Sequence, residues 1–158
     1  MKPVACNDGA EDDGAVVRLV SLRLDRQMIG LPIEQVRDVF QFQEVAPVPL
    51  ADAAVCGLVN LRGRVVLLLS LAGLIGLGPG RQPPRLAVSL LWRGEVTAIA
   101  IDEIGDVLAL SAGASLPVPG HLAGPWARAA RRVHRLDDEL LIELDLQTLM
   151  DLPPAQAA

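Results

Sequence analysis

Two strongly apolar runs separated by a short charged segment constrain the fold of this chain more than any other feature. The runs are residues 55–59 and 65–71, and between them lies Asn60-Leu61-Arg62-Gly63-Arg64. Glycine and asparagine readily adopt the positive-φ backbone of a tight turn, so the stretch predicts a β-hairpin with a charged tip. Because nearly every residue of both arms is apolar, we expect the rest of the chain to cover both faces of the hairpin. The arginines of the tip are then the groups that can meet another molecule.

The composition favours a folded domain and disfavours nucleic-acid binding. The chain has 158 residues, of which 51% are hydrophobic, and this is ample for a core. Two Phe, two Trp and no Tyr leave few side chains on which bases could stack, and the net charge is −5. Acidic residues gather in the first thirteen positions, so the remainder is almost balanced in charge. No uncharged run is long enough for a membrane helix, and direct membrane insertion is not predicted.

An internal repeat runs through most of the chain. Residues 90–107 match residues 22–39 at a constant offset of 68, which aligns Val36 with Ile104 and Asp38 with Asp106. The Pro-Val-Pro of residues 47–49 returns at 117–119, and the apolar run 67–71 has its counterpart in 142–146. A period of about seventy residues is too long for a solenoid, so the repeat indicates two similar subdomains.

Short strands with turn residues between them predict the architecture. Each repeat holds some five such strands, and curling into a small barrel protects edges that a flat sheet would expose. We therefore predict an all-β, mainly β fold of two small barrels packed together, with short helical turns. The subdomains are expected at about 15–80 and 85–150, with exchange of a strand left open, inside a single domain 15–152. Residues 1–14 are expected to form a disordered leader and residues 153–158 a tail.

Residue types that could support catalysis or bind a metal form no recognisable site. Cys6 and Cys56 are expected to be reduced thiols. His121 and His134 have no cysteine or acid at ligand spacing. No serine or histidine lies in a nucleophile motif, and the carboxylates fall at turns, where their pKa values should be ordinary. We predict no enzyme activity, no cofactor and no metal.

Two other groups of residues have structural interpretations. Phe40 and Phe42 lie two apart on an expected strand, a spacing more typical of core residues than of exposed binding anchors. The arginines at positions 128, 131, 132 and 135 lie beside acidic residues 137–139, and this indicates solvated strand edges rather than a phosphate site.

Four successive blocks resemble those of the CheW-like domain family. They are Leu31-Pro32-Ile33 with residues 36–39, the G-x-x-N-L-R-G block of residues 57–63 with the following Arg64 and Val65, residues 100–107, and the closing residues 140–150. The resemblance covers roughly residues 16–150, and the G-x-x-N-L-R-G block is its specific part. It implies two SH3-like five-stranded β-barrels that intertwine and carry neither catalysis nor a cofactor.

The resemblance also implies a function and two contact surfaces. Family members are cytoplasmic, non-enzymatic adaptors that couple the cytoplasmic tips of chemoreceptors to the regulatory domain of a CheA-type histidine kinase at membrane receptor arrays, where self-association is a further expectation. The receptor-binding residues implied here, near the seam between the barrels, are Val36, Arg62, Gly63, Ile104 and Val107. The kinase-binding residues implied, on the first subdomain, are Asp38, Glu44, Val45 and Gly57.

Two departures from the family pattern leave alternatives open. The family's proline and aspartate in the strand after the hairpin are replaced by Leu67 and Ser70. Serine can cap a helical turn as aspartate does, so we expect the fold to survive. The chain could then be a paralogue that serves a non-flagellar chemosensory pathway. A different class of function, a small β-barrel that binds peptides or single-stranded nucleic acid outside any receptor array, is disfavoured by the few aromatics and the negative charge.

Overall fold

The computed structural model describes residues 15–24, 27–51, 54–75, 84–119 and 125–151. The predicted leader, the tail, His121 and Cys6 lie outside these ranges. The helices are short, and none in the described part of the chain is long and apolar enough to cross a membrane. The elements in chain order are β1 (Val16–Leu24), β2 (Gln27–Pro32), the 3-10 turn η1 (Ile33–Gln35), β3 (Asp38–Gln41), β4 (Val55–Leu61), β5 (Arg64–Ser70), α1 (Leu71–Leu74), β6 (Leu86–Trp92), β7 (Glu95–Ile101), β8 (Glu103–Ser111), the 3-10 turn η2 (Ala112–Ala114), α2 (Pro125–Ala129), β9 (Ala130–Arg135), β10 (Leu140–Leu144) and α3 (Leu146–Asp151).

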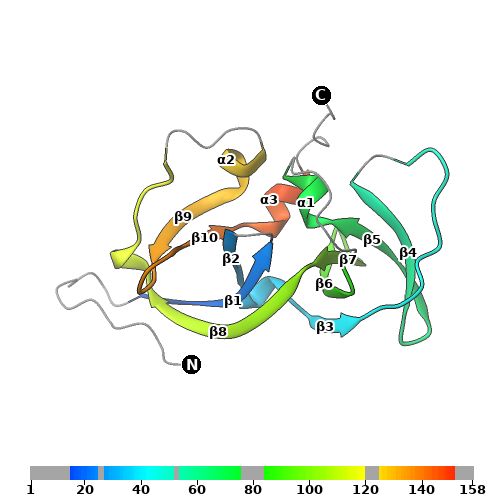
Figure 1. Ribbon diagram of the computed structural model, residues 1–158, viewed down its shortest axis with the longest axis horizontal. Helices are drawn as coiled ribbons and strands as arrows, with labels where there is room; N and C mark the ends of the chain where they lie inside the picture. Colours follow the sequence, from blue (N-terminus) through cyan, green and yellow to red (C-terminus); the bar gives the residue numbers. More distant parts are fainter. Residues whose placement is uncertain (1–14, 25–26, 52–53, 76–83, 120–124, 152–158) are drawn as a thin grey trace.

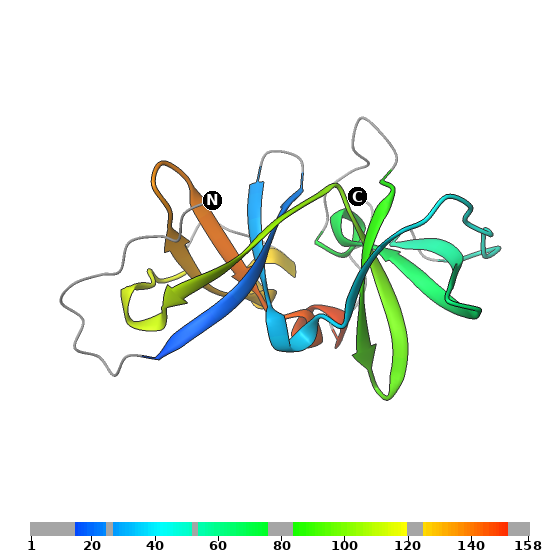
Figure 2. The same cartoon turned by 90° about the horizontal axis from the view of Figure 1, so that it is seen from below.

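The strands form two five-stranded sheets that curl into two small barrels side by side (Figures 1 and 2). One sheet has the order β8-β1-β2-β10-β9 and is called the terminal barrel here; the other has the order β3-β6-β7-β5-β4 and is called the central barrel. Paired backbone hydrogen bonds between Leu116 and Val133 close the terminal barrel, and equivalent bonds between Ala46 and Leu58 close the central barrel. The predicted all-β fold of two SH3-like five-stranded barrels is confirmed.

The barrels do not correspond to the two halves of the chain. The terminal barrel combines β1 and β2 with β8, β9 and β10, whereas the central barrel contains all strands from β3 to β7. A boundary near residues 80–85 therefore does not separate the sheets. The two repeats exchange a pair of strands, since β1 and β2 join β8, β9 and β10 while β6 and β7 join β3, β4 and β5. The chain passes between the barrels after β2 and again after β7, as Figure 2 shows.

Strand register shows that the two barrels repeat the same plan. The parallel pair β2 and β10 sets Ile142 opposite Ile29, and the parallel pair β5 and β7 sets Leu67 opposite Thr97. Ile29 and Thr97 are 68 positions apart, the offset found in the sequence, and Leu67 and Ile142 are 75 apart, as their two apolar runs are. The internal repeat thus has a structural counterpart, and paired strand residues of one barrel have equivalents in the other.

Three apolar clusters hold the molecule together. The largest lies in the seam between the barrels, where both sheets contribute fully buried residues such as Leu31, Leu90 and Ile101. A second fills the central barrel around Leu68, and a third fills the terminal barrel around Leu141. Each barrel alone has a small core, so the shared seam supplies the burial that a barrel of this size lacks.

The hairpin of β4 and β5 forms as predicted, but its turn differs in detail. The positive φ angles belong to Arg62, at 55°, and Gly63, at 84°, rather than to an asparagine and a glycine. Asn60 instead accepts a hydrogen bond from the Gly63 amide through its side-chain oxygen at 2.8 Å. That bond holds the turn in the primed geometry that suits a two-residue hairpin. Most of both arms is covered, although Val65 near the tip is exposed.

Candidate protein-interaction surface

Val36 and Ile104 lie where the chain passes between the barrels. Val36 follows η1 and Ile104 is the second residue of β8, and the repeat makes the two positions equivalent. Both side chains are half-buried and pack against the seam cluster. Val107, farther along β8, is 53% exposed. Val36 and Ile104 are therefore held in place by the seam cluster, and Val107 is accessible to a partner.

The other two predicted receptor-contact residues form the tip of the β4–β5 hairpin. Arg62 is largely exposed, and its guanidinium lies 3.4 Å from a carboxylate oxygen of Asp38 at the start of β3. Asp38 belongs to the predicted kinase-contact set, so this ion pair brings the two sets together at one point. An exposed pair of this kind contributes little stability, and both groups can exchange their contact for one with a partner.

The remaining predicted kinase-contact residues lie where the central barrel closes. Gly57 is buried with φ at 144°, and a Cβ atom there would overlap the carbonyl oxygen of Ala46 and come within 2.6 Å of Cγ1 of Val45. Val45 is half-buried and Glu44 is exposed. Because Gly57 has no side chain, the segment that contains Val45 and Ala46 can approach β4. It then forms the bridge that closes the central barrel. Glu44 is thus the accessible member of this group.

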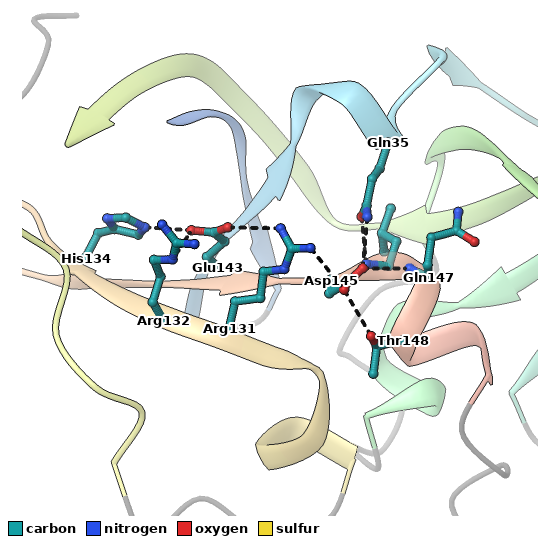
Figure 3. A network of polar contacts seen from close by, with 9 residues as sticks. Gln35, Arg131, Arg132, His134, Glu143, Asp145, Gln147 and Thr148 are labelled. Atoms are coloured by element: carbon teal, nitrogen blue, oxygen red, sulfur yellow. Dashed lines mark hydrogen bonds and ion pairs between the residues drawn. The ribbon is translucent and has the colours of Figure 1, made fainter. Parts of the chain in front are cut away.

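A buried ionic cluster in the terminal barrel was not predicted. Glu143, in the middle of β10, is 1% exposed, and its carboxylate lies 2.8 Å from Nε2 of His134 and 3.5 Å from Nε of Arg132 (Figure 3). Arg131 reaches the same carboxylate at 3.8 Å and also contacts Asp145 at 3.3 Å. Arg131 and Arg132 lie on the edge strand β9 and keep solvent exposure, at 45% and 30% of their side chains, as predicted. Their contact with a buried acid was not predicted.

Asp145 connects this cluster to the seam. Its carboxylate accepts hydrogen bonds from the Gln35 side chain at 2.8 Å, from the Thr148 hydroxyl and from the backbone N–H of Gln147. Burial by itself would raise the pKa of Asp145, but the bonds from Gln35 and Thr148 and the charge of Arg131 outweigh it and lower that pKa. The expectation of ordinary carboxylate pKa values is therefore wrong for Asp145. Gln35 belongs to η1, so this contact fixes the turn that precedes Val36.

The sequence contains one signal for this network. Glu143 is the single charged residue in the run from Leu140 to Leu144, and an acid in an apolar strand requires a buried partner. In the part of the chain that the structure describes, no three His, Cys, Asp or Glu residues gather as a metal site would require. Burial raises the pKa of the Cys56 thiol, so this free cysteine is a poor nucleophile.

Phe40 and Phe42 are core residues, as predicted. Both are half-buried and pack against the apolar cluster inside the central barrel. They are thus not available as exposed anchors, and the accessible apolar side chains near the seam are Val107 and its equivalent Val39, at 53% and 44% exposed.

Comparison with known proteins identifies close counterparts of this arrangement. A family model described as the CheW-like domain matches residues 18–153. A protein named as a chemotaxis protein CheW in Treponema pallidum is 28% identical over 152 residues, covering 93% of this chain and 86% of the relative. A probable chemotaxis protein CheW of Rhizobium etli is 23% identical and covers 89% of this chain and 91% of its own. The crystal structure of the scaffolding protein TtCheW from Thermoanaerobacter tengcongensis superimposes with a TM-score of 0.74 at 19% identity, covering 87% of this chain and 94% of that one.

Proposed function

The chain belongs to the CheW-like domain family, and we propose that it is a non-enzymatic adaptor that couples chemoreceptors to a CheA-type histidine kinase in bacterial chemotaxis signalling. The observation that carries this proposal is the family match, which spans both barrels from residue 18 to residue 153. Relatives that cover most of the chain are named as chemotaxis proteins. In this role the protein works in the cytoplasm and is recruited to receptor arrays at the membrane.

The proposed receptor contact consists of Val36, Ile104 and Val107 with Arg62 and Gly63 at the hairpin tip. Support comes from their setting, since Val36 and Ile104 rest on the seam cluster while Val107 and the Arg62 side chain are exposed. A helical receptor tip could bury an exposed valine and replace Asp38 as the partner of Arg62. The contact would then gain apolar burial without a large rearrangement of the adaptor.

The proposed kinase contact consists of Asp38, Glu44, Val45 and Gly57 on the central barrel. Glu44 offers an accessible charge, and the closing bridge beside Gly57 gives the contact a fixed backbone. Because Asp38 pairs with Arg62, a partner on one surface changes the ion pair available to the other. The proposal therefore includes communication between the two contacts through this single pair.

Ser70, which stands where the family has an aspartate, still caps the helix that follows. The Ser70 hydroxyl accepts a hydrogen bond from the Gly73 amide at 3.0 Å and caps α1, as predicted. Asp145 is the equivalent residue in the terminal barrel and caps α3 in the same way. A chain with this cap can serve the main pathway or a non-flagellar one, and the proposal covers both.

Pull-down assays with the kinase regulatory domain and with the cytoplasmic hairpin of a receptor test the proposal. We expect the chain to bind both, and we expect Arg62→Ala to weaken binding while the melting temperature changes little, because the Arg62 ion pair is exposed. Arg18→Ala, an exposed arginine on β1, is the matched control and should leave both interactions unchanged. Failure of the unaltered chain to bind either partner at roughly tens of micromolar would remove the proposal.

A further inference from the structure

The open ends of the two barrels, where the hairpin turns lie, differ in a way that points to a binding site. The end of the central barrel carries the turns of β4–β5 and β6–β7, which have the same Arg-Gly pair at positive φ. The end of the terminal barrel carries the end of β1, the start of β2 and the turn of β9–β10. The register equivalence allows these two mouths to be compared residue by residue.

An internal ion pair spans the mouth of the terminal barrel. Arg23 at the end of β1 contacts Glu139, just before β10, with two nitrogen-to-oxygen distances of 3.1 and 3.3 Å. The Gln27 side chain adds a hydrogen bond across the same opening to the carbonyl oxygen of Leu140 at 3.2 Å. A guanidinium and a carboxylate supplied by this chain therefore satisfy each other at that end.

The mouth of the central barrel lacks this ion pair. The equivalent of Arg23 is Leu91, and the equivalent of Glu139 is Arg64. The central barrel therefore has no carboxylate at the position of Glu139 and cannot form this ion pair. A hollow of about 440 Å³ lies there, lined by Arg37, Arg64, Val65, Val66, Leu91, Gly94, Glu95 and Val96. The terminal barrel has a smaller hollow of about 320 Å³ at its β9–β10 turn, lined by residues 135–140, and there Glu139 already pairs with Arg23.

The hollow combines positive charge with accessible apolar surface. Arg37 and Arg64 have no carboxylate partner among the residues that the structure describes, and Glu95 is the acid on the rim. Val65 is 69% exposed and Leu91 is 42% exposed beside them. Two unpaired guanidinium groups beside accessible apolar side chains match a ligand that carries both negative charge and apolar surface.

We propose that the mouth of the central barrel binds a peptide segment of a partner protein in which a carboxylate side chain stands beside an apolar one. The apolar side chain packs against Leu91 and Val65, and the carboxylate pairs with Arg64, as Glu139 pairs with Arg23 in the terminal barrel. The inference does not depend on the proposed receptor and kinase contacts, because none of the residues assigned to them lines the hollow.

The test is an NMR titration of the full ¹⁵N-labelled chain with the capped peptide Leu-Asp-Leu-Glu-Leu-Asp. We expect saturable shifts confined to residues 64–66 and 91–96, and none with the same peptide in which Asn and Gln replace the acids. The double variant Arg64→Glu with Leu91→Arg installs the ion pair of the terminal barrel in the central mouth. It should weaken binding roughly tenfold or more, because a charge-assisted contact is lost.

The single variant Arg64→Glu should weaken binding in the same way. Arg18→Glu makes the same charge change as Arg64→Glu at an exposed site of the terminal barrel, and as the control it should bind the peptide as the unaltered chain does. Melting curves show whether each variant is folded, and Arg64→Gln serves as a milder second variant. Equal losses in Arg18→Glu and Arg64→Glu would mean general charge attraction and would overturn the proposal. So would the absence of saturable shifts at roughly millimolar peptide.

Discussion

The interiors of the two barrels solve the same packing problem with different chemistry. Inside the terminal barrel Glu143 meets His134 and Arg132, whereas the equivalent residues of the central barrel are Leu68, Val59 and Gly57. Glu143 and Leu68 are buried almost equally, at 1% and 0% exposed. One backbone plan therefore accepts either an ion cluster or an apolar cluster, provided that every buried charge has a partner.

The strands that pass between the repeats show a second difference. Phe40 of β3 lies opposite Ala87 in the central barrel, and the equivalent pair in the terminal barrel is Leu108 opposite Leu19. A large residue facing a small one replaces two of middle size, and the number of side-chain carbon atoms is the same in both pairs. The exchange of strands between repeats thus required matched interiors and not identical ones.

The largest effect is expected from removing Glu143. Glu143→Ala leaves buried His134 and part-buried Arg132 without their acid, and we expect a loss of about 3–5 kcal/mol in the free energy of unfolding. Glu143→Leu combined with His134→Val copies the central barrel. It should reduce the free energy of unfolding far less, because apolar groups replace both partners. Urea unfolding measures both variants. A loss under about 1 kcal/mol in Glu143→Ala would show that the cluster is not needed.

A smaller loss is expected from Gly57→Ala, which tests how the central barrel closes. The added methyl would meet the backbone of Ala46 in a φ region that suits glycine, and we expect a loss of about 2–3 kcal/mol. Gly63→Ala is the control, since φ is also positive there but its Cβ would meet nothing within 4 Å. That variant should lose only about 1 kcal/mol in the same urea assay. Equal losses would mean that contact with Ala46 plays no part.

The equivalence of these two residue pairs can be tested by exchanging them. Phe40→Leu removes volume from the central barrel and should lose roughly 1 kcal/mol, whereas Ala87→Leu alone overfills it and should lose about 1–3 kcal/mol. The double variant recreates the pair found in the terminal barrel and should lose less than the sum of the two. Strict additivity in a double-mutant cycle would contradict the equivalence of the two barrels.

The smallest effect concerns pH. The folded-state pKa of Asp145 is lowered, so its ionised form contributes stability above the unfolded-state pKa, and this contribution is lost as the pH falls through the folded value. Asp145→Asn should therefore reduce the steepness with which stability declines in acid. Ser70 has the equivalent capping role without a charge, and Ser70→Ala should leave that acid dependence unchanged. Melting temperatures measured across the acid range compare the two caps.

Much of the fold could be predicted from local patterns, and the failures have physical reasons. Apolar alternation and turn residues located the β4–β5 hairpin, and the repeat predicted two similar units. The period could not show which sheet β3 and β8 join, because strand-forming residues do not specify their partners. The turn was misassigned because Asn60 acts through its side chain while Arg62 adopts the positive φ.

The polar sites were harder to predict for a similar reason. Arginine is usually a surface residue, so the residue type alone gave no reason to expect a buried partner for Arg131 and Arg132. Only the position of Glu143 inside an apolar strand indicated such a partner. The predicted contact between Arg62 and a partner rested on the family resemblance, and the pairing of Arg62 with Asp38 became visible only in three dimensions.

Reconstituted signalling tests the central claim most directly. Membrane-embedded chemoreceptors and the cognate CheA-type kinase are mixed with or without this chain, and kinase autophosphorylation is followed with and without attractant. We expect the chain to raise kinase activity and to make it responsive to attractant, and we expect Arg62→Ala to diminish both effects although the variant is folded. Kinase activity that is the same with and without the chain, under conditions where an established coupling protein restores control, would contradict the account.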